Sequence, residues 1–191
     1  HPVLTLGKSG QIDNLLVSEQ ILRQRGVEFF QIERGGDITY HGPGQLVMYP
    51  IFDLQHFCSA EAEAGSRRGI GLKEYINEQK MKRAAVILFL KDVGIEAERL
   101  EGATGVWLDA HSPRARKICA IGVKASRFVT MHGLAFNINT DLSYFRLINP
   151  CGFVDKGVTS LQQELGGQVQ DMAACQARLR EKFHQLFPIN G

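Results

Sequence analysis

The stretch "RGGDITYHGPGQ", Arg34 to Gln45, holds four glycines and a proline in twelve positions. The runs on either side of it, "VEFFQIE" (27–33) and "QLVMYPIFDL" (45–54), are rich in β-branched and aromatic residues and predict strands. We therefore expect the glycine-rich stretch to be a loop between two strands. Glycine gathers where the backbone takes positive φ or where another group approaches more closely than a Cβ allows. We expect another group to lie close against this loop.

The composition is that of an ordinary globular chain. The 191 residues are 44% hydrophobic and 22% charged, which predicts one domain, 1–191, with a sizeable core. Basic and acidic residues number 22 and 20, so nucleic acid is not an expected partner. No run approaches the roughly 20 apolar residues of a membrane helix, and no signal peptide is evident. We expect a cytoplasmic protein with no membrane partner, whose natural chain begins before His1.

The second half of the chain alternates between strand and helix patterns. A helix is predicted from Gly71 to Val93, ended by Gly94, with its apolar last turns buried. Short apolar runs between Ile95 and Ile138 predict several strands, and the polar "HSPRAR" (111–116) predicts a hairpin turn between two of them. Asp141 marks the start of a short helix. A final helix is predicted from residues at helical spacing, Met172, Cys175, Leu179, Phe183 and Leu186.

Two short glycine patterns fail as nucleotide-binding motifs. "GKS" at Gly7 to Ser9 lacks a glycine five residues before Gly7, where Pro2 stands. "GPGQLV" lacks the third glycine of a dinucleotide-binding turn. Phosphate binding by either pattern is therefore disfavoured.

The four cysteines stand at 58, 119, 151 and 175, without C-x-x-C or zinc-ligand spacing. Neither a metal centre nor a disulfide framework is expected. Cys175 falls on the apolar side of the final helix, and Cys58 has no charged neighbour in sequence. Cys151 differs, because Pro150 and Gly152 on either side place a small nucleophile in an open loop. A loop thiol without a chemical role fits this pattern equally well.

Longer blocks carry a resemblance to a known family. "RGGDITYHGPGQLVMYPI", "KICAIGV", "HGLAFNINTDL" and "PCGFVDKGVTSL" occur in the order and approximate spacing of lipoyl(octanoyl) transferases, and "TLGKSGQIDNLL" is similar to their early segment. The resemblance covers nearly the whole chain. It implies an α+β fold, a mixed β-sheet with flanking helices, similar to the catalytic domain of biotin and lipoate protein ligases. The family's leading strand and helix would precede residue 1.

The resemblance also implies an activity and its partners. Such enzymes move an octanoyl group from octanoyl-acyl carrier protein to a lysine of lipoyl domains, as in 2-oxoacid dehydrogenase complexes and the glycine cleavage H protein. The acyl group passes through a cysteine thioester. No metal, nucleotide or organic cofactor is implied.

The functional residues implied by the resemblance lie in four segments. Cys151 matches the cysteine that carries the acyl group, and Lys117 matches the lysine that lowers the pKa of that thiol. The remaining matches are substrate-lining residues, with leucine at 134 where phenylalanine is common: Arg34, Gly35, Gly36, Asp37, Ile38, Thr39, Tyr40, His41, Ala120, Ile121, Gly122, Gly133, Leu134 and Ala135.

Acid–base chemistry supports a cysteine–lysine pair. A free thiol with a pKa of about 8.5 is mostly protonated at neutral pH, whereas the thiolate is the nucleophile. A neighbouring ammonium group lowers the thiol pKa. Once the sulfur is acylated, the lysine has lost the anion that held its proton, so it can take a proton from the attacking amine. One lysine then serves both half-reactions.

Strand alternation bears on the lysine and on a rival nucleophile. Lys117 shares parity with Cys119, Ile121 and Val123, so we expect it on the same face as these residues, whereas Lys124 has the opposite parity and is expected at the surface. Alternatively Lys117 ends the turn and points to water. Cys119 is a rival nucleophile, although its apolar neighbours favour core packing.

Two histidines remain open. His41 and His132 each precede a glycine, and each could orient substrate or hydrogen-bond the reacting carbonyl. Alternatively, both satisfy backbone carbonyls.

Two other functions fit the sequence. An ATP-dependent lipoate or biotin ligase on the same fold would not need Cys151. A non-catalytic acyl or carrier-protein binding module would associate with carrier without transferring the acyl group.

Overall fold

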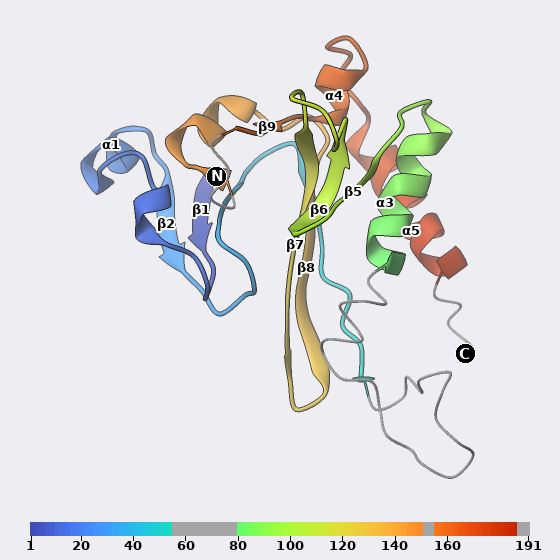
Figure 1. Cartoon of the computed structure of the whole chain (residues 1–191), viewed down its shortest axis with the longest axis horizontal. Coiled ribbons are helices and arrows are strands. Elements are labelled where there is room, and N and C mark those ends of the chain that lie inside the picture. The colour runs from blue at the N-terminus through green and yellow to red at the C-terminus, as the bar shows by residue number, and fades with distance from the viewer. Residues whose placement is uncertain (55–79, 151–154, 187–191) are drawn as a thin grey trace.

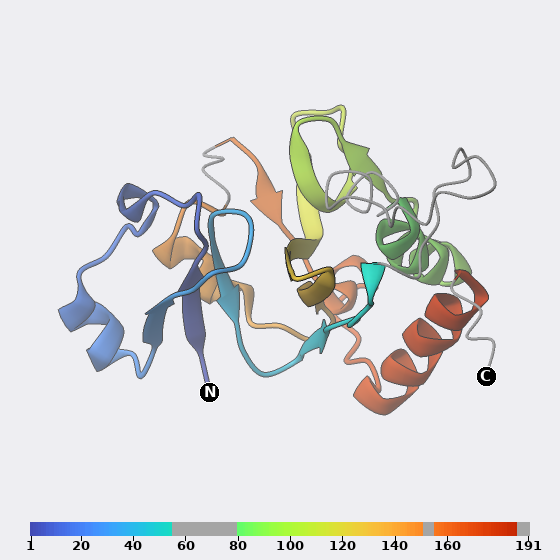
Figure 2. The ribbon, with the colours of Figure 1, turned by 90° about the horizontal axis from the view of Figure 1, so that it is seen from below.

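The computed structural model describes residues 1–54, 80–150 and 155–186. It contains two mixed or antiparallel sheets with helices packed on them, which confirms the predicted α+β class (Figure 1). Figures 1 and 2 both place the larger sheet between the smaller sheet on one side and two long helices on the other.

The smaller sheet has the order β2-β1-β3. Its strands are β1 (Val3–Leu6), β2 (Glu28–Gln31), parallel to β1, and β3 (Ile38–His41), antiparallel to β1. Leu4, Ile38 and Tyr40 form a core with residues of the 3-10 helix η3 (Leu142–Leu147), which begins at Asp141 as predicted.

Two short helical segments connect β1 to β2. They are the 3-10 helix η1 (Ile12–Asn14) and helix α1 (Glu19–Gln24). The hydroxyl of Ser18 accepts a hydrogen bond from the Ile21 N–H at the start of α1, which is the usual role of serine at this position.

The glycine-rich stretch is not one loop, so that prediction was wrong. Strand β3 lies inside it, because "ITYH" is β-branched and aromatic and pairs along the whole of β1. The predicted flanking strands are also shorter than expected, since β2 ends at Gln31 and the next strand, β4, covers only Gln45–Met48.

The larger sheet has the order β4-β8-β7-β6-β5. Its long central pair is β7 (Arg116–Ser126) and β8 (Val129–Asn137), flanked by β4 and by β6 (Ala103–Leu108) and β5 (Glu98–Leu100), all antiparallel to their neighbours. The turn between β6 and β7 contains the predicted "HSPRAR" hairpin segment except for Arg116, which is the first residue of β7.

A short parallel strand, β9 (Gly157–Val158), completes this sheet. Gly157 pairs with Arg116 and Val158 with Lys117, at the position beside β7 that lies beyond the end of β8. The chain therefore returns to the strand of Lys117 soon after residue 154.

Helices cover one face of the larger sheet. Helix α3 (Lys80–Asp92) and helix α5 (Met172–Leu186) pack over it, and the short α4 (Leu161–Glu164) follows β9. Phe89 of α3 meets Phe136 of β8 edge to face, with ring centroids 5.3 Å apart. Gly94, at φ +77°, ends α3 as predicted, whereas residues 71–79 of that predicted helix lie outside the described residues.

A bulge in β7 separates Lys117 from the residues after it. Trp107 pairs with Lys117 and Val106 with Cys119, so two neighbouring residues of β6 oppose three of β7. Val106 and Cys119 belong to the core under the helices, whereas Trp107 belongs to a separate cluster. The prediction that Lys117 and Cys119 share a face was therefore wrong, because the extra residue, Ile118, reverses the alternation.

Among residues 1–54, 80–150 and 155–186, no helix is both long and apolar enough to cross a bilayer.

Candidate active site

A pocket lies where the smaller sheet meets the open face of the larger one. Its walls come from β1, from the 34–37 segment and β3, and from the adjacent strands β4, β7 and β8. These predicted residues line it: Arg34, Gly36, Asp37, Ile38, Thr39, His41, Lys117, Ala120, Ile121, Gly122, Gly133, Leu134 and Ala135.

Three predicted site residues are placed elsewhere or are not described. The ring of Tyr40 lies in the core of the smaller sheet, stacked on Tyr144 with centroids 4.8 Å apart. Gly35 packs its backbone against β7 and donates its N–H to the Val123 carbonyl. Cys151 lies outside the described residues.

Lys117 is a buried lysine, only 5% exposed, so it does not point to water. Its Nζ lies 4.7 Å from the centre of the Trp107 ring, its cross-strand neighbour. A cation over an indole face is favourable, and more so when water is excluded. The sheet therefore holds a cationic amine at the wall of the pocket.

Arg34 brings a second buried positive charge to the pocket. Its guanidinium donates to the carbonyl and hydroxyl of Thr5 and to the carbonyls of Gly35 and Asp37, at 2.6–3.3 Å. These contacts tie the 34–37 segment to β1. Arg34 thus fixes the shape of the segment while its charge faces the site.

The carboxylate of Asp37 connects the same segment to the chain before α1. It accepts three hydrogen bonds, at 2.5–3.2 Å: from the backbone N–H groups of Ile38 and Gln11 and from the side-chain amide of Asn14. The backbone carbonyl of Asn14 in turn accepts from the N–H of Asn149. The residues just before Cys151 are therefore anchored to the wall of the pocket.

Two histidines line the pocket and are kept neutral by their surroundings. Burial, together with the positive charge of Arg34, lowers the pKa of His41 against the opposing effect of its hydrogen bond with Gln45. Burial, Arg34 and Lys124 lower the pKa of His132, which takes a φ of +61° and meets Tyr49 edge to face.

The glycines of the 34–45 stretch are required by the fold itself. A Cβ on Gly35 would lie 2.8 Å from the Val123 carbonyl oxygen, and one on Gly122 would lie 2.7 Å from the Gly35 oxygen. The backbone of the glycine-rich segment therefore packs directly against strand β7, which brings Arg34 onto the sheet.

Cys119, the rival nucleophile, is fully buried on the helix side of the sheet. Burial raises the pKa of its thiol to about 12 against the weaker effects of a backbone hydrogen bond and Lys117. A thiol in this state is a poor nucleophile.

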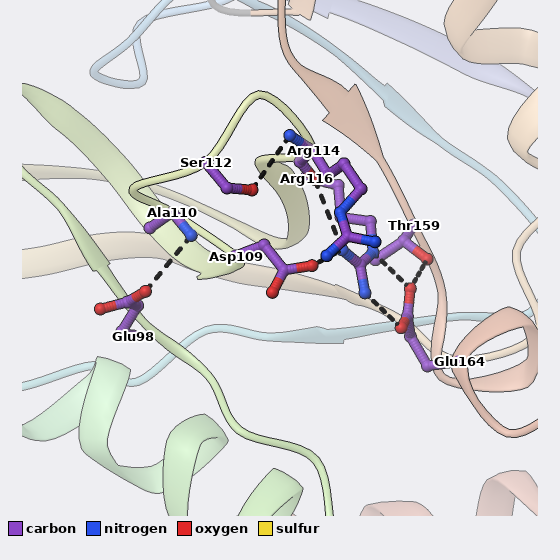
Figure 3. Close-up of polar contacts among 8 residues, drawn as sticks. All are labelled: Glu98, Asp109, Ala110, Ser112, Arg114, Arg116, Thr159 and Glu164. Atoms are coloured by element: carbon purple, nitrogen blue, oxygen red, sulfur yellow. Dashed lines mark hydrogen bonds and ion pairs between the residues drawn. The ribbon is translucent and has the colours of Figure 1, made fainter.

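A polar network holds β9 against β7 (Figure 3). Arg116 donates twice to Glu164, at 2.7 Å each, and once to Asp109, at 2.5 Å, while the Thr159 hydroxyl donates to Glu164. Arg116 lowers the pKa of Glu164. This network fixes the strand of Gly157 and Val158 beside Lys117.

Several pocket residues were not among the predicted ones: Thr5, Ile32, Val47, Tyr49 and Thr104. His132, whose role the sequence left open, also lines the pocket. Val47 lies in the short strand β4 and Tyr49 directly follows it, two positions along, so both are expected on the same face of the strand. Their side chains are 46% and 56% exposed. Large apolar side chains on the exposed side of a predicted strand were the available signal. Within the described residues, no group of three or more His, Cys, Asp or Glu side chains could hold a metal.

These features define the class of the protein. Residues 1–184 match the model of a protein family described as "Lipoyl protein ligase A/B catalytic domain". The chain is a member of that family. The resemblance seen in the sequence is thereby confirmed.

The relatives within this family carry a more particular name. An octanoyltransferase of Parabacteroides distasonis is 59% identical over 97% of this chain and 78% of its own length. One from Bacteroides fragilis is 56% identical over 94% of this chain and 75% of its own. Among solved structures, a bipartite lipoate protein ligase from Thermoplasma acidophilum shares the fold, with a TM-score of 0.68 over 98% of this chain and 68% of its own, at 14% identity.

Proposed function

We propose that this chain is an acyltransferase that moves an octanoyl group from octanoyl-acyl carrier protein to a lysine of a lipoyl domain. The name of its relatives, at 48–59% identity over 88% or more of this chain, supports the reaction class. The observation that carries the mechanism is the buried Lys117, which lies in a pocket lined by most of the predicted substrate residues. Lipoyl domains of 2-oxoacid dehydrogenase complexes and the glycine cleavage H protein are the proposed acceptors, in the cytoplasm.

In the first half-reaction, the Cys151 thiolate attacks the carrier thioester. A bond forms between sulfur and the carbonyl carbon, and the carrier sulfur leaves as a thiolate. The ammonium group of Lys117 favours the ionised form of Cys151 before attack. Anchored segments on both sides of Cys151 support this pairing, because Asn149 is held by Asn14 and Val158 by Lys117.

In the second half-reaction, the acceptor amine attacks the enzyme thioester. A C–N bond forms, the C–S bond breaks, and Cys151 departs as a thiolate. Between the two half-reactions Lys117 gives its proton to the departing carrier thiolate, which is released as a thiol. The proton of the amine then passes to Lys117, and the cysteine–lysine ion pair is restored. Water-poor surroundings around Lys117 favour this exchange because they strengthen the ion pair.

The experiment is acylation followed by intact mass measurement and peptide mapping. Incubation with octanoyl-acyl carrier protein should add one octanoyl group to Cys151, and a lipoyl domain should remove it. Cys119→Ser is the matched control and should still form the adduct, whereas Cys151→Ala should not. An adduct on Cys119, or none on the wild-type protein, would contradict the proposal.

The ligase alternative is tested in the same assay. The ATP-dependent reaction predicts that Cys151→Ser keeps its activity and that free octanoate with ATP replaces the carrier. We expect neither result. Tight carrier binding without any acyl transfer would instead favour the binding-module alternative.

A further inference from the structure

A hydrogen-bonded chain of side chains connects His41 in the pocket to the residues beside Lys117. It runs from the His41 ring to the Gln45 amide, then to the Asn137 amide and to the backbone of Thr159. The Thr159 N–H donates to the Lys117 carbonyl at 3.0 Å. Strands β3, β4, β8 and β7 are thus joined around the pocket by one network.

The donor and the acceptor of each hydrogen bond in this network follow from the group at its end, the Thr159 carbonyl. The Thr159 carbonyl can only accept, so the NH₂ group of Asn137 faces it, at 3.0 Å. The Asn137 oxygen then accepts from the NH₂ group of Gln45, at 2.9 Å. That NH₂ group also donates to the Tyr40 carbonyl, a second group that can only accept, at 3.1 Å. The Gln45 amide therefore has one possible orientation.

This orientation settles the tautomer of His41. The Gln45 side-chain oxygen lies 2.9 Å from His41 Nδ1 and can only accept, so Nδ1 carries the hydrogen. In the neutral ring, Nε2 is then an acceptor with a free lone pair. Burial and the charge of Arg34 lower the pKa of His41, which keeps this form present at neutral pH. The other ionisable groups that line the pocket with it are Asp37, Lys117 and His132.

The pocket therefore offers a fixed neutral acceptor beside two cationic donors, Arg34 and Lys117. An acceptor of this kind suits an incoming N–H group. In the proposed reaction, N–H groups arrive on two ligands: the amine of the acceptor lysine and the amides of the carrier's arm. The amine must also be held with its lone pair aimed at the thioester carbon, a geometry that an acceptor behind it supplies.

We propose that Nε2 of His41 accepts a hydrogen bond from the ε-amine of the acceptor lysine and orients it for attack on the enzyme thioester. His41 takes no proton in this step, because the proton passes to Lys117. The inference rests on the proposed function and assigns His41 to the second half-reaction alone.

Two substitutions separate the acceptor from the network. His41→Asn keeps an NH₂ group near the position of Nδ1 but has no acceptor at Nε2, whereas His41→Gln places an amide oxygen near Nε2. Single-turnover rates are measured separately for acylation by octanoyl-acyl carrier protein and for discharge to a lipoyl domain. We expect His41→Asn to slow discharge roughly tenfold, the scale of one lost hydrogen bond, and to leave acylation within about threefold of wild type. His41→Gln should recover most of the discharge rate.

The dependence of the discharge rate on pH is a further test, because it would not change if His41 had only a structural role. In Gln45→Glu, a carboxylate next to Nδ1 favours the imidazolium, whose Nε2 is a donor rather than an acceptor. The discharge rate of wild type should fall as pH drops through the depressed pKa of His41. In Gln45→Glu, the same fall should occur at higher pH. The acylation profile should shift less than the discharge profile.

The outcomes are distinguishable. Slower acylation with normal discharge would overturn the inference in favour of the carrier's amides. Equal slowing of both steps, or no shift of the discharge profile in Gln45→Glu, would show that the network is structural only. If the wild-type protein forms no Cys151 adduct at all, the proposed function fails first and the assignment of His41 fails with it.

Discussion

The contact between Gly35 and Gly122 determines how closely the Arg34 segment approaches strand β7. Gly122 faces the segment from the sheet, with Gly35 O and Arg34 Cδ within 2.7 and 3.3 Å of the position a Cβ would take. Backbone atoms cannot move aside as a flexible side chain can. The guanidinium therefore reaches its place in the pocket because both residues lack a side chain.

We expect Gly122→Ala to displace the 34–37 segment from the sheet. Overpacking of this kind costs about 1–3 kcal/mol of unfolding free energy. Transfer of the octanoyl group should fall by more than the stability change explains, because Arg34 and Asp37 move with the segment. Denaturant unfolding and single-turnover transfer rates measure the two effects. Ser126→Ala, on the exposed end of the same strand, is the control and should match wild type.

The backbone of the turn that joins β7 and β8 is strained. Arg127 and Phe128 take φ values of +49° and +65°, a conformation that two-residue hairpin turns need and that asparagine and glycine adopt at lower cost. The pair Arg127→Asn with Phe128→Gly should raise the unfolding free energy by roughly 1 kcal/mol. Thermal unfolding measures the change. Phe128→Ala keeps a Cβ, and an equal gain in that variant would contradict this explanation.

The ion pair between Arg116 and Glu164 is partly buried and connects β9 to β7 through side chains. Because Arg116 lowers the pKa of Glu164, the pair stabilises the fold above the unfolded carboxyl pKa, about 4.3, and this stability is lost as pH falls through the lower folded value. Glu164→Gln should therefore cost about 1–3 kcal/mol at pH 7 and much less near pH 2. Urea unfolding at both pH values provides the measurement. An equal cost at both values would mean that charge plays no part.

Regular elements were predictable from sequence because their patterns are local. The apolar spacing of Cys175, Leu179 and Phe183 predicted α5, and Gly94 correctly marked the end of α3. Strand β3 was missed because its four residues lie among glycines and are held by pairing with β1, a contact between distant segments. The bulge at Ile118 was missed because alternation assumes no inserted residue, and the insertion is defined only by the partner strand.

At the scale of the whole molecule, the pocket depends on segments that meet only in the fold. The resemblance supplied most of the lining. Thr5 and Tyr49 stand inside matched blocks but were not singled out, whereas Thr104 comes from a segment outside them. Tyr40 shows the reverse case, since it stands inside the matched block but alternation along β3 turns its ring into the core. A motif identifies a segment, and the pairing of its strand decides which side chains reach the site.

Asp37 joins distant parts of the molecule, and its removal should be felt across them. Asp37→Ala removes the acceptor of three hydrogen bonds, from Gln11, Asn14 and Ile38. We expect amide hydrogen exchange to accelerate across residues 11–16, and the unfolding free energy to fall by about 2 kcal/mol. Exchange in α5 should not change beyond the global loss of stability. Unaltered exchange in 11–16 would show that this connection is dispensable.

The position of Trp107 has a practical consequence. It is the chain's only tryptophan, and the ammonium of Lys117 lies directly over its ring. An indole's fluorescence responds to nearby charge, so every event that alters the charge balance around Lys117 should be visible without a label. Loading of Cys151 should change the emission of the wild-type protein and leave that of Cys151→Ala constant. The enzyme would then report its own turnover, half-reaction by half-reaction, in a stopped-flow cuvette.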